Sequence, residues 1–156
     1  MAMERTLILL KPDAFQRALI GEIVSRFEKK GLKIVGMKML HMTPAVSKEH
    51  YGHLTSKPFY PGLEKFITSG PILAFVLEGQ EAVEVVRTVV GVTNSRKATA
   101  GTVRGDLSMS TGRNTIHASD SIETAKKEVA RFFKKEELFD YKLELWDYLY
   151  AEDEKA

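Results

Sequence analysis

Short apolar runs alternate along this chain with amphipathic helical stripes, and this alternation restricts the available folds more than any other feature. The first run, Thr6–Leu10, is continuously apolar after its threonine and is closed by Lys11-Pro12. Runs of about four to eight apolar residues are typical of strands buried on both faces. We expect further strands at Leu32–Met42, Ile72–Leu77 and Asn114–Ala118.

Three longer segments have the apolar spacing of helices that pack on one face. The first, Ala14–Lys30, follows Asp13 as a predicted cap and precedes Gly31, which stands where a left-handed C-cap glycine belongs. The second is expected at Ala82–Val90. The third, at Ile122–Phe133, follows Ser119-Asp120-Ser121, which can cap a helix start.

The remaining segments are less regular. Residues 44–68 hold two short helical candidates on either side of Lys57-Pro58-Phe59-Tyr60-Pro61, because the prolines break any longer helix. Residues 91–113 have little hydrophobic period, and structureless loops above about 12–15 residues are usually functional or disordered. The aromatic-rich tail, residues 134–156, is interpreted as irregular.

The order of these elements predicts an α/β (α+β) fold class. The expected architecture is a ferredoxin-like βαββαβ sandwich, with a four-stranded antiparallel sheet and helices on its faces. Crossovers are expected to be right-handed. No repeat or linker divides the chain, so we predict a single domain over residues 1–156, with the tail 134–156 packing on neighbours.

Composition narrows the class of protein. The chain is 44% hydrophobic and 28% charged, as in ordinary globular domains. No apolar run approaches the roughly 18–20 residues of a membrane span, and no signal peptide is recognisable. The absence of cysteines excludes thiol catalysis and Cys-based zinc sites. It also fits a reducing compartment, so we expect a cytoplasmic protein. A pI of about 8.7 falls short of that expected of a dedicated nucleic-acid binder.

The histidines are the first candidates for chemistry. His50 and His53 stand three apart on an expected helix, a spacing that can place two metal ligands on one face. A zinc site needs at least three protein ligands, and no third is evident, so we favour a structural or surface role and predict no protein metal site. His41 has no obvious partner and is interpreted as structural.

His117 differs from the others in its neighbours. It lies in a short apolar strand just before a capped helix start, where unpaired N–H groups favour an anion. A histidine there can act as nucleophile or general base. On local features alone, however, a satisfied core histidine is the more common case.

Four cations are expected to converge near His117, because strand ends and crossover ends can meet in one region of a ferredoxin-like unit. Arg104 and Arg113 precede the fourth expected strand in the loop, Arg87 is on the second helix, and Lys11 ends the first strand. Arginine forks match phosphate oxygens, and lysine supplies a compact charge. With hydroxyls such as Thr93 they would suit a polyphosphate, although each taken singly is more often a solvated surface charge.

The segment Asn114–Ser121, NTIHASDS, resembles the active-site signature of the nucleoside diphosphate kinase family. The resemblance runs from Glu4 to about Tyr150 and its motifs follow the family's order. They include Lys11-Pro12-Asp13, His50-Tyr51, Pro58-Phe59-Tyr60-Pro61-Gly62, Ser69-Gly70-Pro71, Gly101-Thr102-Val103-Arg104-Gly105-Asp106 and Gly112-Arg113-Asn114.

The resemblance implies a ping-pong reaction in which His117 accepts the γ-phosphoryl group of a nucleoside triphosphate and passes it to a nucleoside diphosphate. It implies that Glu128 holds the far imidazole nitrogen and that Ser119 assists by hydrogen bonding near Glu128. A nucleophilic histidine needs a fixed tautomer, which such a partner supplies. Tyr51 would support Lys11 and the γ-phosphate site.

The resemblance also implies how the nucleotide is held. Lys11 and Asn114 would bind the ribose hydroxyls, and Lys11 would approach the transferring group. Phe59 would stack on the base, which suits broad base specificity because every base has a π-face. The phosphates would be held by Arg87, Thr93 and Arg104. Mg²⁺ would arrive with the nucleotide, and the assembly would be a homohexamer, with a tetramer as the alternative.

The sequence departs from the family's pattern in three places, after the first expected strand, at two prolines of the long loop and at Thr111. Ala14 replaces the glycine after Lys-Pro-Asp, Ser95 and Ala100 replace prolines, and Thr111 stands where an aliphatic residue often covers the base. Each lost proline is expected to cost about 0.4–1 kcal/mol, because the unfolded loop has more freedom to lose. These changes concern loop rigidity, base affinity and assembly.

The sequence argues against other functions. The sequence has no GxxxxGK[ST] P-loop and no GxGxxG fingerprint. The runner-up, a nucleic-acid-binding module on the same fold, needs exposed sheet aromatics in an RNP1-like run, and none is found. A non-catalytic scaffold is the third interpretation, and the retained His117, Lys11, Arg104 and Asn114 argue against it.

Overall fold

A four-stranded sheet, antiparallel at every pairing, forms the centre of the computed structural model, which describes residues 2–155. The strands are β1 (Met3–Leu10), β2 (Lys33–His41), β3 (Pro71–Gln80) and β4 (Ile116–Ala118). They are arranged in the order β2-β3-β1-β4. This arrangement confirms the predicted ferredoxin-like βαββαβ architecture.

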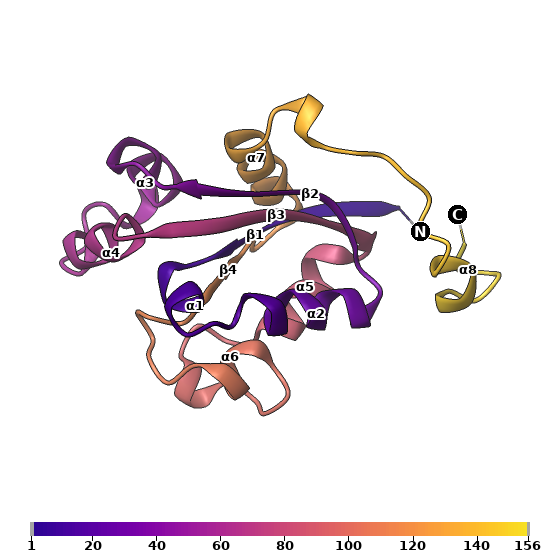
Figure 1. The fold of residues 1–156 in the computed structure, drawn as a ribbon, viewed down its shortest axis with the longest axis horizontal. Coiled ribbons are helices and arrows are strands. Elements are labelled where there is room, and N and C mark those ends of the chain that lie inside the picture. The colour runs from indigo at the N-terminus through magenta and orange to yellow at the C-terminus, as the bar shows by residue number, and fades with distance from the viewer. Residues whose placement is uncertain (1, 156) are drawn as a thin grey trace.

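One face of the sheet is covered by α2 (Ile20–Lys30) and α5 (Ala82–Val90), with α1 (Pro12–Gln16) and α6 (Val103–Leu107) beside them (Figure 1). The two long helices bury their apolar stripes against alternate residues of β1 and β3. At the centre of this core, Phe27 and Phe75 meet edge to face with ring centroids 5.9 Å apart.

The opposite face is covered by α7 (Ile122–Phe132), and α3 (Pro44–His50) and α4 (Tyr60–Ile67) lie at the end of the sheet where β2 ends and β3 begins (Figure 1). Apolar residues of all three helices join one core cluster, and a short 3-10 turn, Gly52–Leu54, follows α3. Burial from both sides explains why Leu7–Leu10 is continuously apolar, since all four side chains are fully buried. Aromatic stacking on an open sheet, which the nucleic-acid module needs, is not available when helices cover both faces.

The predicted helix over Ala14–Lys30 is wrong as a single element, because the structure divides it into α1 and α2. The break falls at Ala18, whose φ of 55° is left-handed. Asp13 lies inside α1 and is not its cap; its carboxylate accepts a hydrogen bond from the backbone N–H of Thr115 instead. Gly31, in contrast, is a left-handed C-cap as predicted, with φ of 98°.

The long loop is better ordered than its sequence indicates. It contains a 3-10 turn, Ser95–Lys97, as well as α6, whose start is capped by the Thr102 hydroxyl accepting from the N–H of Gly105. The Ser95 hydroxyl donates to the carbonyl of Ser110 at 3.0 Å, so the residue that replaces a proline ties two parts of the loop together.

The C-terminal tail follows β2 of its own chain. It includes the 3-10 turn Lys135–Glu137 and α8 (Trp146–Leu149). The backbone N–H of Phe139 donates to the carbonyl of Val35 at 2.7 Å, and the Trp146 indole N–H donates to that of Gly31 at 2.9 Å. Packing of the tail on neighbouring subunits stays a prediction. Among residues 2–155, no helix has the length and apolar character to cross a membrane.

Candidate active site

Strand alternation places His117 on the α7 side of the sheet. Its neighbours in β4, Ile116 and Ala118, belong to the core on the α2 and α5 side, so the side chain between them points the other way. His117 is opposite Leu9 in the register with β1, and its side chain keeps 21% exposure at the edge of a cavity.

Glu128 fixes the orientation of the His117 ring. Its Oε2 lies 2.7 Å from Nε2 of His117, and the Ser119 hydroxyl donates to the same oxygen at 2.9 Å. A carboxylate only accepts, so the imidazole proton belongs on Nε2. Nδ1 then carries the lone pair, and no residue within 2–155 hydrogen-bonds to it. Glu128 is nearly fully buried, about two turns along the helix that Ser121 caps.

Lys11, Asn114 and Thr93 form a hydrogen-bonded chain beside this pair. The Lys11 ammonium donates to Oδ1 of Asn114 at 2.7 Å, and Nδ2 of Asn114 donates to the carbonyl of Thr93 at 3.3 Å. Desolvation, together with the positive charge of Arg104, lowers the pKa of Lys11 to about 8. The buried amine is therefore poised to gain stabilisation from an anion.

A strained turn holds Asn114 in place. Thr115 has a φ of 66°, which is costly for a β-branched residue. Its N–H donates to the Asp13 carboxylate at 3.0 Å, and its carbonyl accepts from the N–H of Lys11 at 2.8 Å. These bonds from α1 and the end of β1 hold the turn against its strain.

Arg104 is anchored by backbone carbonyls on both sides of the site. Its two terminal nitrogens donate to the carbonyl of Gly91 at 3.0 Å and to that of Ile116 at 2.6 Å. Desolvation, followed by the charge of Arg87, lowers the pKa of Arg104 to about 10, so it stays charged at neutral pH. Neither Arg87 nor Arg104 forms an ion pair with another residue of the described part of the chain, and two neighbouring guanidinium groups favour binding of a polyanion.

These side chains line one cavity of about 800 Å³. Its cations are Lys11, Arg87, Arg104 and Arg113, against a single lining carboxylate, Asp120, among the described residues. Phe59 is 57% exposed on its wall. The structure thus brings together all the predicted site residues: His117, Lys11, Tyr51, Phe59, Arg87, Thr93, Arg104 and Asn114 line the cavity, and Ser119 and Glu128 lie buried behind His117.

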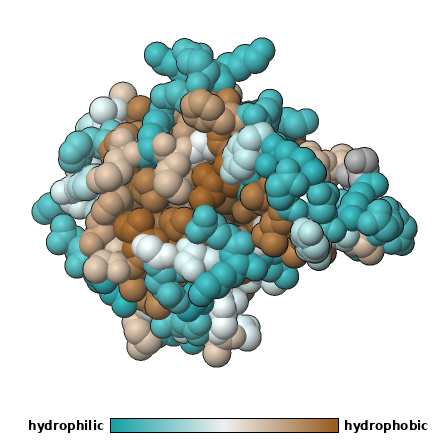
Figure 2. All heavy atoms as spheres, turned by 45° about the vertical axis from the view of Figure 1, so that its right-hand side comes forward, coloured by the Kyte–Doolittle hydropathy of each residue, from teal (hydrophilic) through white to brown (hydrophobic). Residues whose placement is uncertain are grey.

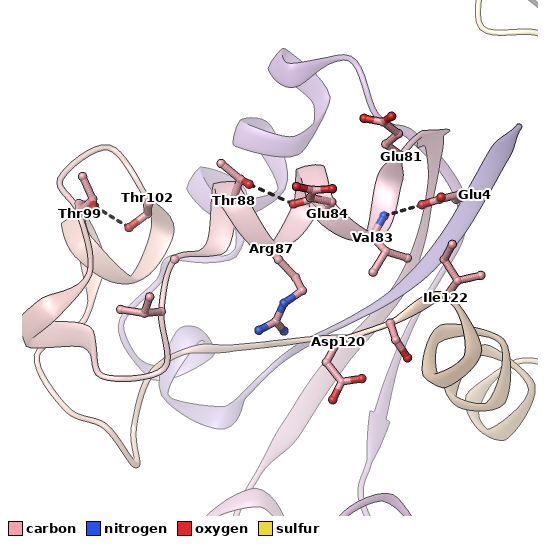
Figure 3. Close-up of a pocket in the computed structure, with 13 residues that line it drawn as sticks. Glu4, Glu81, Val83, Glu84, Arg87, Thr88, Thr99, Thr102, Asp120 and Ile122 are labelled. Atoms are coloured by element: carbon pink, nitrogen blue, oxygen red, sulfur yellow. Dashed lines mark hydrogen bonds between the residues drawn. The ribbon is translucent and has the colours of Figure 1, made fainter. Parts of the chain in front are cut away.

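A second cavity of about 940 Å³ adjoins the first, and Arg87 and Asp120 line both. Arg87 extends into it from α5, and Asp120 enters from the segment before α7 (Figure 3). Three further carboxylates, those of Glu4, Glu81 and Glu84, also line it. A polyphosphate therefore fits the first cavity better than the second.

Two residues near His117, His50 and Arg131, were not predicted from the sequence to belong to the site. His50 does not form a metal-binding pair with His53; it is buried with its ring centroid 4.6 Å from that of His117, while His53 lines the cavity. Arg131 hydrogen-bonds to His50. The one available signal was the adjacency of His50 to Tyr51, because Arg131 lies 81 residues away in the chain.

Comparison with known proteins identifies the family. Residues 4–138 match the sequence model of the nucleoside diphosphate kinase family. The chain belongs to this family. A nucleoside diphosphate kinase of Rhodopirellula baltica is 53% identical over 152 residues, which cover 97% of this chain and 100% of that one. One from Archaeoglobus fulgidus is 47% identical over 150 residues, covering 96% and 99%.

Solved structures agree with this assignment. A nucleoside diphosphate kinase of Halobacterium salinarum in complex with CDP superposes with a TM-score of 0.93 at 43% identity, covering 96% of this chain and all of the other. One from Babesia bovis has a TM-score of 0.90 at 42% identity, covering 94% and 99%. As a member of the nucleoside diphosphate kinase family, the protein is a nucleotide-binding phosphotransferase.

Proposed function

We propose that this kinase works by a ping-pong mechanism through phosphohistidine at Nδ1 of His117. The observation that carries the proposal is the 2.7 Å contact between Nε2 of His117 and the Glu128 carboxylate at the edge of a cationic cavity. That contact leaves the lone pair on Nδ1 of a ring that lines the cavity.

In the first half-reaction Nδ1 attacks the γ-phosphorus of a nucleoside triphosphate. The N–P bond forms as the bond from phosphorus to the β,γ-bridging oxygen breaks, and the nucleoside diphosphate leaves with the electron pair. The ring gains positive character while its proton stays on Nε2, and the Glu128 carboxylate stabilises that charge. The second half-reaction reverses these steps with another diphosphate as acceptor.

The cavity residues supply positioning and charge, which phosphoryl transfer mainly requires. We assign the phosphates to Arg87, Arg104 and Thr93. We assign the ribose hydroxyls to Lys11 and Asn114, which are hydrogen-bonded to each other, and Lys11 also approaches the transferring group. Tyr51 is buried beside them, and desolvation followed by the charge of Glu128 raises the pKa of its hydroxyl, so it serves as a neutral hydrogen-bonding group.

The base would stack on the exposed ring of Phe59, which is tolerant of base identity. Mg²⁺ would enter bound to the nucleotide. With one carboxylate, Asp120, lining the described part of the cavity, phosphate oxygens and water would provide most of its ligands, which suits this ion. When bound, the ion neutralises phosphate charge.

Two wider properties belong to the same proposal. We infer a homohexamer, with a tetramer as the alternative, on the strength of the family resemblance. We infer a cytoplasmic location from the absence of cysteines together with that resemblance. Neither property enters the chemistry at His117.

Transfer of radiolabelled γ-phosphate from ATP tests the nucleophile. Wild type should acquire a label stable to alkali and labile to acid, and His117→Ala should acquire none. His41→Ala, at the exposed end of β2, is the matched control and should label like wild type. Labelling of His117→Ala, or retained transfer between nucleotides in that variant, would contradict the mechanism.

A further inference from the structure

The ring of His50 packs against the ring of the proposed nucleophile, His117. His50 is only 5% exposed, and its ring meets the ring of His117 edge to face with centroids 4.6 Å apart. Tyr51 and Phe132 make similar contacts with His50, at 4.7 and 5.2 Å. No step of the proposed mechanism uses His50, although it is packed directly against the reacting ring.

Arg131 determines which nitrogen of His50 carries the proton. A terminal nitrogen of the Arg131 guanidinium lies 3.0 Å from Nδ1 of His50. A guanidinium only donates, so Nδ1 must accept and the proton must be on Nε2. The Nε2–H group is buried and has no hydrogen-bond partner within residues 2–155. Burial, followed by the charges of His117 and Arg131, lowers the pKa of His50 to about 2, so the ring stays neutral.

His50, His117 and Glu128 together have the composition of a metal site. One donor atom each from His50, His117 and Glu128 lie within 4.8 Å of one another. Two histidines and one carboxylate are a known ligand set for zinc. A ligating imidazole nitrogen must offer a lone pair while the other nitrogen carries the proton. In His50 the only lone pair is at Nδ1, where Arg131 already lies.

We propose that Arg131 fixes His50 in its Nε2–H tautomer and thereby keeps transition-metal ions out of the cluster formed by His50, His117 and Glu128. A bound zinc ion would take Glu128 away from His117, or occupy the His117 ring itself. The benefit of exclusion rests on the proposed function, in which His117 must remain a free nucleophile held by Glu128. Arg131 is thus a positioning residue, and its Nε lies 3.2 Å from the largely exposed carboxylate of Glu49, an ion pair without hydrogen-bond geometry.

The tautomer can be observed directly by two-bond ¹H–¹⁵N NMR correlation of the histidine rings in the full-length protein. The wild type should give the Nε2–H pattern for His50, assigned by its loss in His50→Phe. Arg131→Met removes the donor and should shift the pattern toward Nδ1–H. Arg131→Lys, whose ammonium also only donates, should resemble wild type. An Nδ1–H pattern in wild type would overturn the proposal.

Zinc titration of the nucleotide-free enzyme by calorimetry tests the consequence. Arg131→Met should bind Zn²⁺ at least about tenfold more tightly than wild type, and the double variant with His50→Phe should lose that gain. Lys127→Met is the matched control, because it removes an exposed cation from the same helix, and it should leave zinc affinity unchanged. Equal affinity in wild type and Arg131→Met would contradict the proposal.

These measurements are independent of phosphoryl transfer. If His117 failed to take the phosphate label, the proposed function would fail while the NMR and zinc results could still hold. Conversely, normal labelling with an Nδ1–H pattern for His50 would reject only the role of Arg131. Thermal unfolding of each variant checks that zinc affinity is compared between folded proteins.

Discussion

A single hydrogen bond decides which atom of His117 is able to react. The carboxylate of Glu128 requires a proton on Nε2, and the hydroxyl of Ser119 fills another site on the same oxygen. His50 is fixed in the same tautomer by a different device, the donor of Arg131. At the scale of single residues, the tautomer of each histidine ring therefore follows from its partner. Glu128 can only accept a hydrogen bond from His117, and Arg131 can only donate one to His50.

Replacing Glu128 by glutamine should slow phosphorylation of His117. The amide is nearly isosteric but uncharged, and its NH₂ group can donate to Nε2, which would move the ring proton to Nδ1 and block attack. We expect kcat to fall about 10²–10⁴-fold with little change in KM. Rapid-quench measurement of phosphoenzyme formation gives the rate. Glu123→Gln, exposed on the same helix, should behave as wild type, and an undiminished rate in Glu128→Gln would rule out the orienting role.

The depressed pKa of Lys11 predicts a loss of activity at alkaline pH. Burial and Arg104 lower this pKa to about 8, so the amine is charged below that pH and neutral above it. Only the charged form attracts phosphate, so kcat/KM for ATP should fall about tenfold per pH unit above about pH 8. Bound phosphate raises the pKa, so the decline in kcat should start at higher pH.

Initial-rate profiles between about pH 6 and 10 would measure this effect. Lys11→Arg should shift the decline in kcat/KM to higher pH, because a guanidinium stays charged there. A profile for wild type that remains flat through this range would contradict the assignment of Lys11 to the phosphate-binding charge.

At the scale of elements, apolar periodicity predicted the helices that pack against the sheet. It did not predict breaks and short helices whose conformation depends on non-local contacts. The stripes of α5 and α7 were recognised because each buries one face in a continuous core. The break at Ala18 was missed because its neighbours still follow a helical stripe. α6 was missed because five residues make too short a period, and its order comes from a cap and from contacts with the loop.

Gly105 shows how tightly α6 is fitted. A Cβ at this position would lie 2.0 Å from the carbonyl oxygen of Thr99, so Gly105→Ala must displace α6 or the loop. We expect a loss of about 1–3 kcal/mol in the free energy of unfolding, and a raised KM for nucleotides because Arg104 is the preceding residue. Urea denaturation and steady-state kinetics measure the two effects.

Gly21→Ala is the matched control for that change. Gly21 is exposed in α2, and an added Cβ there meets nothing within 4 Å. The variant should gain about 0.5–1 kcal/mol, since alanine loses less backbone freedom in a helix. Equal stability changes in the two variants would mean that the close approach of α6 to Thr99 has no energetic weight.

At the scale of the molecule, the site is made where the ends of separate elements converge. Lys11 directly follows β1, Arg87 lies on α5, and His117 lies in the edge strand β4. The topology could be predicted from the order of strands and helices, and it allowed strand ends and crossover ends to meet, but which side chains form the site came from family resemblance. Spacing in sequence carries no sign of it, as the partnership of Arg131 with His50 across 81 residues illustrates.

The edge of the sheet bears on how copies of this molecule assemble. β2 is an edge strand with Met37 43% and Met39 60% exposed, and hydrophobic residues also gather on the face of the molecule seen in Figure 2. The tail hydrogen-bonds to this edge at Val35, and the exposed apolar side chains farther along the strand favour contact with another chain. If the proposed homohexamer uses this edge, light scattering should give six times the 17.5 kDa chain mass for wild type and a smaller multiple for Met39→Lys, because burying a charge there costs free energy.

The control is Met3→Lys, on β1, which should keep the wild-type mass. A wild-type mass of one chain would reject the assembly, and an unchanged mass in Met39→Lys would show that β2 does not form the contact.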